Sequence, residues 1–310
     1  MKITALAGGV GGAKLVDGLA HVLPPEDLTV VVNTGDDFEH LGLYICPDLD
    51  TICYTVAGMA NPSTGWGRAD ETWQTMMNLK RLGGPTWFQI GDQDFATHIE
   101  RTRRIRDNQP LSQIVREFCK IWGIKQTILP MSDQPVRTIV ETDEGVLDFQ
   151  EYFVHRECGP HVKGFKFVGI KAAKPAQGIF EAIDDADAIV ICPSNPWVSI
   201  GPILSLVGMK SKIKSRKVIA VSPIIGGHAV KGPAAKMYLE LGIQPSAISV
   251  AQQYKGIATH FVLDKTDAML QPDILRLNIK PFVTDTLMKT FKDRQQLALD
   301  VLNFMGSKNQ

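Results

Sequence analysis

The fold is decided by residues 2–14, whose sequence is KITALAGGVGGAK. The first half of this stretch is a short apolar run, typical of a buried strand. After the glycines, Leu15, Leu19 and Val22 recur at helical spacing. The pattern predicts a strand, a glycine loop and a helix in succession.

The glycine loop predicts an anion site. Four glycines in five residues let the backbone approach a ligand closely. The helix that follows directs its free N–H groups and about half a positive charge at the loop. A tight turn without a ligand is the alternative, but such a turn needs only one or two glycines. The candidate phosphate-binding residues are Gly9, Gly11, Gly12 and Lys14.

The loop does not reveal which nucleotide it binds. The P-loop pattern fails because Ala13 precedes Lys14 and Leu15 follows it. The dinucleotide pattern also fails, since Lys14 stands where the third glycine belongs. From the loop alone, the predicted ligand is therefore a nucleotide or a phosphate ester.

Composition narrows the class of protein. The 310 residues are 44% hydrophobic and 21% charged, which suits one large α/β domain or a core with a helical insert. Lys plus Arg and Asp plus Glu number 33 each, so neither nucleic acid nor a membrane is expected as a partner. Five cysteines without C-x-x-C spacing predict neither a zinc site nor a disulfide framework. Without a signal peptide or a long apolar run, we expect a cytoplasmic protein.

Two acidic loops follow the second predicted strand, residues 28–33. They carry Asp36, Asp37, Asp48 and Asp50. Asp48 is expected to be the N-cap of the helix that it opens. Any one of these aspartates taken singly would also be explained by contact with a ribose or by a place in a solvent-exposed turn. Four carboxylates near a phosphate loop repel one another unless a cation lies between them, so we favour a metal site at these four residues.

Residues 57–123 are predicted to be a largely helical insert. Asp92 or Asp94 is expected to cap a helix on which His98 is a satisfied helix-face histidine. Arg101 and the three arginines that follow it at 103, 104 and 106 are expected to form a solvated face, with contact of one of them to a phosphate as the alternative. The strand-like periodicity of residues 126–171 predicts an antiparallel hairpin appended to the sheet.

Further core strands are predicted at 186–192, 217–221 and 260–264, with a closing helix at 292–305. In an open α/β sheet the loops after such strands meet at the carboxyl edge, where ligands bind. Phosphate or nucleobase is expected to contact Ser194, Asn195, Ser222 and Gly226 there. The predicted class is α/β, with a Rossmann-like, mostly parallel sheet flanked by helices in a single domain of residues 1–310.

Together these motifs resemble the 2-phospho-L-lactate transferase (CofD-like) family of coenzyme F420 biosynthesis, in its bacterial branch. The matching stretches run in order from residue 5 to about 240. They are Gly8–Lys14, Val32–Asp37, Cys46–Thr51, Gly91–Asp94 with Ala96–His98, Leu129–Asp133, Pro193–Pro196, Ser199–Leu204 and Val221–Gly226.

The resemblance implies a reaction. A GDP-type diphosphate ester of a three-carbon acid, 2-phospholactate or phosphoenolpyruvate, passes its phosphorylated acid to the ribityl hydroxyl of a deazaflavin and releases GMP. The resemblance also implies Mg²⁺ as cofactor and a homodimer. Deazaflavin contacts are carried over to Asp50, Gln89, Asp94 and His98. Asp50 would also orient the attacking hydroxyl, and Gln89 replaces a basic residue of archaeal members.

Two other functions remain open from the sequence. An NAD(P)-dependent oxidoreductase is disfavoured by the missing third glycine and by the lack of an evident hydride-transfer pair. A non-catalytic regulator that binds nucleotide sugars would share the glycine loop, but it would need neither the acidic residues nor an aromatic slot for deazaflavin. Phosphoryl transfer itself needs positioning and charge stabilisation, so no Ser or Cys nucleophile is required.

Overall fold

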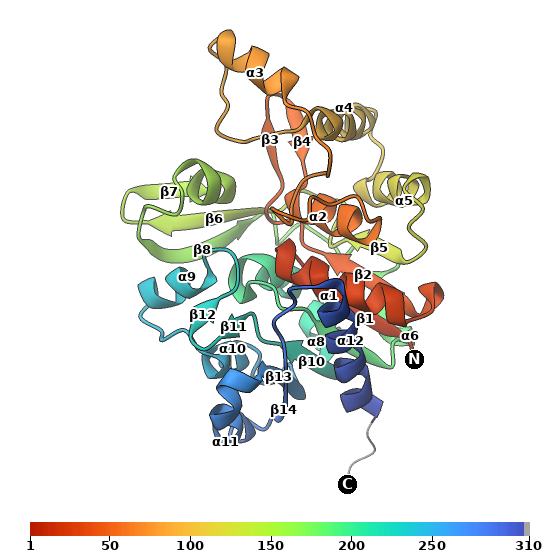
Figure 1. Cartoon of the computed structure of the whole chain (residues 1–310), viewed down its shortest axis with the longest axis vertical. Coiled ribbons are helices and arrows are strands. Elements are labelled where there is room, and N and C mark those ends of the chain that lie inside the picture. The colour runs from red at the N-terminus through yellow and green to blue at the C-terminus, as the bar shows by residue number, and fades with distance from the viewer. Residues whose placement is uncertain (307–310) are drawn as a thin grey trace.

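Seven parallel strands form the central sheet of the computed structural model, which describes residues 1–306 (Figure 1). The strands are β1 (Ile3–Ala7), β2 (Leu28–Val32), β5 (Thr127–Pro130), β9 (Ala188–Ile191), β10 (Lys217–Val221), β13 (His260–Asp264) and β14 (Lys280–Thr284). Their order is β14-β13-β10-β9-β1-β2-β5, with every neighbouring pair parallel. The order reverses between β1 and β9, as in dinucleotide-binding folds. The predicted Rossmann-like class is confirmed.

Helices cover both faces of this sheet. One face carries α1 (Gly9–Val22), α2 (Pro47–Val56), α5 (Leu111–Ile121) and α12 (Phe291–Gly306). The other carries α6 (Ile179–Asp185), α7 (Gly201–Ser205), α8 (Met209–Lys214), α9 (Ala234–Glu240), α10 (Ala247–Gln253) and α11 (Gln271–Leu275). Along β1, Ala5 and Ala7 face the first layer and Leu6 faces the second. Burial on both faces explains why the strands are continuous apolar runs.

An arm projects from one end of the molecule, at the top of Figure 1. It consists of the hairpin β3 (Phe38–His40) and β4 (Leu43–Ile45) with α3 (Gln74–Arg81) and α4 (Asp92–Arg106). Of the three helices between residues 57 and 123, α5 packs on the central sheet instead of in this arm.

Within residues 126–171 the predicted antiparallel hairpin is confirmed, but it belongs to a separate sheet and is not joined to the central one. Thr127–Pro130 is β5 and lies at the edge of the central sheet. The strands β6 (Arg137–Thr142) and β7 (Gly145–Asp148) pair with β8 (Val162–Val168) in a separate antiparallel sheet. A π-helical turn at Glu151–His155 replaces the expected end of the second hairpin strand.

Two elements of the structure carry weak sequence signals. The edge strand β14 contains Pro281, and proline within sheets is found mainly on edge strands. The hairpin β3–β4 has only three residues in each strand. The remaining short elements are Pro25–Asp27, Pro196–Ile200, Lys265–Leu270, β11 (Ile224–Ile225) and β12 (His228–Ala229).

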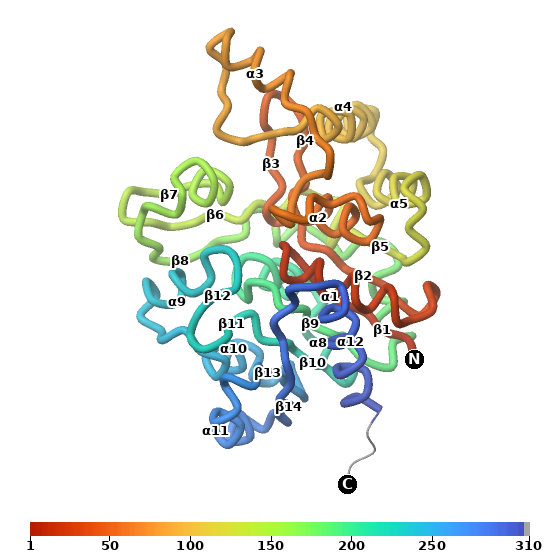
Figure 2. Tube along the Cα trace, viewed as in Figure 1, coloured from red at the N-terminus to blue at the C-terminus, as the bar shows by residue number. Residues whose placement is uncertain are grey.

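The last helix, α12, returns to lie beside the first helix, α1 (Figure 2). A Cβ at Gly18 of α1 would lie 2.1 Å from the Arg294 carbonyl oxygen, so only glycine permits this close approach. The five cysteines are free thiols, and no helix within residues 1–306 is long and apolar enough to cross a membrane.

Candidate active site

A cavity of about 680 Å³ lies at the carboxyl edge of the central sheet, where the strand order reverses. Most of the candidate site residues line it: Gly9, Gly11, Lys14, Asp36, Asp48, Asp50, Gln89, Asp94, His98, Ser194, Asn195 and Ser222. Gly12, Asp37 and Gly226 are not part of its lining. The structure thus brings together residues that lie up to 213 positions apart in the sequence, from Gly9 to Ser222.

The glycine loop is joined to the loop that follows β9. Ser194 Oγ accepts from the Gly8 amide at 3.1 Å and donates to the Gly8 carbonyl at 2.7 Å. A Cβ at Gly11 would lie 2.4 Å from the Pro193 carbonyl oxygen, and one at Gly12 would lie 2.5 Å from Ser194 Oγ. These two glycines therefore let the first turn of α1 pack against the opposite loop. Gly9 adopts φ +64°, which favours glycine.

Asp48 does not cap its own helix, so that prediction is wrong. The N-cap position of α2 is Cys46. The Asp48 carboxylate instead accepts from the Gly9 amide at 2.7 Å, at the N-terminus of α1. Its second oxygen accepts from Asn33 Nδ2 at 2.9 Å. Asn33 Nδ2 also donates to the Val198 carbonyl at 3.2 Å, so this one amide links three loops of the site.

Asp36 and Asp48 form a buried acidic pair. Burial, and next the charge of Asp48, raise the pKa of Asp36 well above its usual range. Burial raises the pKa of Asp48 to about 6. Asp36 Oδ1 is buried without a hydrogen-bond partner among the described residues. A cation between two such carboxylates would remove their repulsion, so this pair fits a hard divalent ion.

The four acids expected to bind metal do not converge as one set. Within residues 1–306 no three side chains of Asp, Glu, His or Cys are arranged as a metal site. Asp37 lies outside the cavity lining, and burial raises its pKa to about 8, with Arg137 opposing the shift. Mg²⁺ commonly takes only one or two protein carboxylates together with substrate phosphates. Asp36 and Asp48 are enough for such a site.

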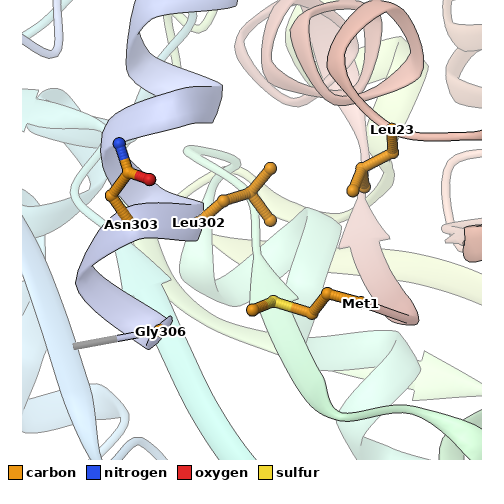
Figure 3. A pocket seen from close by; sticks show the side chains of 5 residues that line it. All are labelled: Met1, Leu23, Leu302, Asn303 and Gly306. Carbon is orange, nitrogen blue, oxygen red and sulfur yellow. The ribbon is translucent and has the colours of Figure 1, made fainter. Parts of the chain in front are cut away.

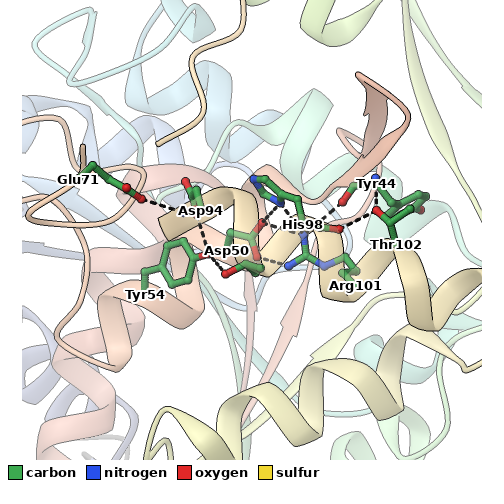
Figure 4. Close-up of polar contacts among 9 residues, drawn as sticks. Tyr44, Asp50, Tyr54, Glu71, Asp94, His98, Arg101 and Thr102 are labelled. Atoms are coloured by element: carbon green, nitrogen blue, oxygen red, sulfur yellow. Dashed lines mark hydrogen bonds and ion pairs between the residues drawn. The ribbon is translucent and has the colours of Figure 1, made fainter. Parts of the chain in front are cut away.

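Arg101 is buried, contrary to the prediction of a solvated face. Its side chain is 2% exposed, and two nitrogens of its guanidinium contact the two carboxylate oxygens of Asp50 (Figure 4). Arg101 Nη1 donates to Asp50 Oδ2 at 3.0 Å, and Nη2 donates to Asp50 Oδ1. The other arginines of this run do not share its burial, because α4 turns only the face with His98 and Arg101 toward α2.

His98 lies beside this ion pair. Its Nδ1 is 3.8 Å from Asp50 Oδ2 and 3.3 Å from Arg101 Nη1. Burial lowers the pKa of His98 to about 4, with the charge of Asp50 opposing the shift. The imidazole is therefore neutral near pH 7, and Arg101 is the cation that neutralises Asp50.

Asp94 is held by Tyr54, whose hydroxyl donates to Asp94 Oδ1 at 2.6 Å (Figure 4). Burial, and next the charge of Asp50, raise the pKa of Asp94 to about 7. No salt bridge to Asp94 occurs within residues 1–306. A carboxylate with this pKa exchanges protons readily at neutral pH.

The expected caps of α4 are also corrected. The N-cap position is Gly91, and the Glu71 carboxylate accepts from the amides of Gln93 and Asp94 at 2.8 and 2.9 Å. Asp92 accepts from the amides of Gln74 and Thr75, both at 2.9 Å, at the start of α3. The two helices of the arm therefore cap each other through acids from the opposite segment.

Two lysines reach the cavity without a carboxylate partner among the described residues. Lys14 Nζ donates to the Met288 carbonyl at 2.8 Å, and Lys231 Nζ donates to the Thr64 carbonyl. Burial, and next the charges of Arg294 and Lys231, lower the pKa of Lys14. The concentration of positive charge favours an anion here. Lys231 had no role in the sequence analysis, since one lysine in a loop carries no spacing signal.

The polar residues after β9 and β10 mainly shape their own loops. Asn195 Oδ1 caps the turn at Pro196–Ile200 by accepting from the Trp197 amide at 3.0 Å. Ser222 Oγ donates to the Ile224 carbonyl at 2.8 Å. The Gly226 amide donates to Asp267 at 3.0 Å. The Ser194 hydroxyl likewise bonds to Gly8. These polar groups therefore mainly fix the backbone conformation of the loops that line the cavity.

Aromatic side chains line the other side of the cavity. They are Trp66, Trp87, Phe88, Phe149 and Phe153. Phe149 and Phe153 are stacked with ring centroids 5.5 Å apart, and Trp87 meets Phe88 edge-on at 5.8 Å. Gln89 lies among them, with its Nε2 donating to the Thr86 carbonyl at 2.6 Å. We call these five aromatic residues the aromatic wall. Because they come from separate segments of the chain, no periodicity in the sequence predicts that they lie together.

A second hollow, of about 540 Å³, lies near the C-terminal end of α12 (Figure 3). It is lined by Met1, Leu23, Leu302, Asn303 and Gly306. This lining offers no acidic, basic or nucleophilic side chain, so the hollow is not a candidate site.

Comparisons with known proteins agree on one family. The family described as "2-phospho-L-lactate transferase CofD" matches residues 3–299. A protein of Methanosarcina barkeri named 2-phospho-L-lactate transferase is 40% identical over 292 residues, covering 94% of each chain. A protein of Streptomyces griseus named phosphoenolpyruvate transferase is 44% identical over 276 residues, covering 86% of this chain and 87% of its own.

A solved structure shares the fold. It is a UPF0052-family protein of Bacillus halodurans, which superposes with a TM-score of 0.63 at 14% identity over 97% of this chain and 98% of its own. At that identity the likeness concerns the fold alone.

Proposed function

Because the chain belongs to the CofD family of 2-phospho-L-lactate transferases, we propose that it transfers a phosphorylated three-carbon acid to a deazaflavin in coenzyme F420 biosynthesis. The donor is a GDP-type diphosphate ester of that acid, the acceptor group is the ribityl hydroxyl, and GMP leaves. The relatives' names include both phospholactate and phosphoenolpyruvate transferases, so either acid suits the family.

One observation carries the proposal. A single cavity has a cationic glycine-loop side and an aromatic side, with the buried acids of α2 between them. A diphosphate fits the first side, and a flat tricyclic ring fits the second. A transferase must hold both substrates at once, and this cavity has a suitable surface for each.

The donor's diphosphate is proposed to lie at the N-terminus of α1. Asp48 engages the Gly9 amide, which leaves the following amides of the first helical turn for the phosphates. Lys14 and Lys231 add two positive charges at the same end of the cavity. The loops that hold Ser194, Asn195, Ser222 and Gly226 would surround the rest of the nucleotide.

Asp36 and Asp48 would hold Mg²⁺ together with the donor's phosphates. When bound, the ion would neutralise charge on the phosphate oxygens. The chain's own contribution is to place the two acids next to the helix N-terminus, where Asn33 fixes the Asp48 carboxylate. Asp50 has Arg101 as its ionic partner and is therefore not part of the proposed metal site.

The acceptor is proposed to stack on the aromatic wall. Stacking on such rings and burial of the flat ring faces would supply most of its binding. Gln89 and His98 line the same region and offer polar contacts to the ring edge or the ribityl chain. Asp50, fixed by Arg101, would orient the ribityl hydroxyl from the α2 side.

The test is a product assay with the full chain. Deazaflavin and Mg²⁺ are mixed with the phospholactate or the phosphoenolpyruvate ester of GDP, and both GMP and the deazaflavin product are followed by mass spectrometry. We expect a phosphodiester-linked deazaflavin, and the preferred donor identifies the acid. GMP release without that product would indicate hydrolysis. Tight binding of a nucleotide sugar with no turnover of either ester would instead favour the regulator.

A further inference from the structure

Two acids of the cavity lining, Asp50 and Asp94, differ in their partners. Asp50 is bound by the guanidinium of Arg101, whereas within residues 1–306 the Asp94 carboxylate receives only a neutral hydroxyl, from Tyr54. Both line the cavity. A carboxylate that lacks an ionic partner is freer to take up a proton than one held in a salt bridge.

The loop at residues 64–67 places Asp94 near the glycine loop. A Cβ at Gly65 would lie 2.7 Å from Val10 Cγ1, and one at Gly67 would lie 3.8 Å from Asp94 Oδ2. Two residues of extended chain span at most about 7 Å. Asp94 Oδ2 therefore lies within about 14 Å of Val10 in the glycine loop, and both residues line the cavity in which the two proposed substrates would meet.

We propose that Asp94 is the general base that accepts the proton of the acceptor's attacking hydroxyl, a role that rests on the transferase function proposed above. The hydroxyl oxygen forms a bond to the phosphorus that carries the three-carbon acid. The bond from that phosphorus to the bridging oxygen breaks, and its electron pair leaves with GMP. The hydroxyl proton passes to an Asp94 carboxylate oxygen, and Tyr54 is the positioning residue that holds the carboxylate.

The charged groups around Asp94 set its response to pH. Burial is the largest influence and raises the pKa of Asp94. Asp50 on α2 and Glu71 before α3 raise it further, while the Tyr54 hydroxyl and Arg101 on α4 lower it. The guanidinium of Arg68 lies over the Tyr54 ring, 5.7 Å from its centroid. With a pKa of about 7, Asp94 becomes ionised as the pH rises through neutrality, so kcat/KM should rise over the same range.

The experiment compares three variants in the product assay across pH 5.5–9. Asp94→Asn keeps the size of the side chain and its acceptor for Tyr54, but it cannot take up the proton. Tyr54→Phe keeps the ring and removes a hydrogen bond that lowers the pKa of Asp94. The matched control is Asp92→Asn, which makes the same change two residues away on a carboxylate that caps α3. Deazaflavin affinity is measured separately by fluorescence.

We expect kcat of Asp94→Asn to fall by about 10²- to 10⁴-fold while the variant still binds deazaflavin. The rise of kcat/KM with pH near neutrality, here called the acidic limb, should be absent in this variant. Tyr54→Phe should move that limb to higher pH, and Asp92→Asn should keep it in place. If Asp94→Asn does not fold, the limb shift in Tyr54→Phe decides the question.

The inference is overturned if Asp94→Asn transfers at near-parent rate or keeps the parent's limb, or if the limb is unmoved in Tyr54→Phe. If the parent protein forms no linked product, the proposed transferase function itself is wrong. If the parent forms the product and Asp94→Asn forms it equally fast, only the role of Asp94 is wrong.

Discussion

The guanidinium of Arg101 and the carboxylate of Asp50 form a buried ion pair between α4 and α2, with Nη1 3.0 Å from Oδ2 (Figure 4). The side chain of Arg101 is 2% exposed and that of Asp50 is 10% exposed. The pair fixes the arm of the molecule against the central layer. It also fixes the orientation of the Asp50 carboxylate, which lines the cavity.

Replacing Arg101 by an uncharged residue should destabilise the fold, because Asp50 would then be buried without an ionic partner. We expect Arg101→Leu to lower the free energy of unfolding by about 3–5 kcal/mol, because an unpaired buried charge remains. Urea denaturation at pH 7 measures the loss. Arg103→Leu, on the exposed face of α4, is the control and should leave stability nearly unchanged. Equal stabilities for the two variants would contradict the structural role of the pair.

Acidification should weaken the fold partly through His98. Its pKa is about 4 in the folded protein, whereas an unfolded chain has a His pKa near 6.5. Between these values the unfolded state binds more protons, so the stability contributed by neutral His98 is lost as the pH falls from 6.5 toward 4.

The stability difference between the parent and His98→Gln should therefore shrink by about 1–3 kcal/mol over that interval. Denaturation curves at pH 7, 5.5 and 4.5 measure it, with the same substitution at exposed His161 as the control. A difference that stays constant with pH would show that His98 is not buried in the neutral form.

The two cavity lysines should govern diphosphate affinity. We expect Lys14→Gln and Lys231→Gln each to weaken GDP binding by about 10- to 100-fold, since each removes a charged hydrogen-bond donor. The loss should shrink at high salt. Calorimetry at two ionic strengths measures both effects, and Lys212→Gln on α8 is the control. GDP affinities within twofold of the parent would place the diphosphate elsewhere.

Gly11 tests whether the glycine loop packs as the structure shows. An Ala in a helix interior normally gains about 1 kcal/mol over Gly. Here the added Cβ would lie 2.4 Å from the Pro193 carbonyl oxygen, so we expect Gly11→Ala to lose stability instead, by about 1–3 kcal/mol. Thermal unfolding without nucleotide measures this. A gain in stability would mean that the loop after β9 lies farther away.

Chelation should separate a metal from a purely structural acidic pair. We expect excess EDTA to abolish turnover while circular dichroism stays unchanged, and added Mg²⁺ to restore it. Asp36→Asn should raise the Mg²⁺ concentration needed for half-maximal turnover, because it removes one of two proposed ligands. Undiminished turnover in excess EDTA would rule out the metal assignment.

The sequence by itself determined five of the seven strands of the central sheet, namely β1, β2, β9, β10 and β13, and the glycine loop that follows the first of them. Strand and helix periods are local properties, and the runs at residues 3–7, 28–32 and 217–221 are apolar on both faces. Such runs predict a buried parallel sheet. Glycine spacing likewise marks a close turn before α1 without any knowledge of the rest of the chain. The family motifs are equally readable, since each is a short contiguous segment.

Only the tertiary structure decided which polar groups meet. Asp48 caps a helix that begins 39 residues earlier, and Arg101 neutralises an acid 51 residues away. Lys231 and the aromatic wall reach the cavity from loops that share no sequence period. A charged side chain obeys no periodicity of its own, and an exposed arginine has the same sequence signal as a buried one. Its partner is fixed only when several elements pack together, because burial is what makes the pairing necessary.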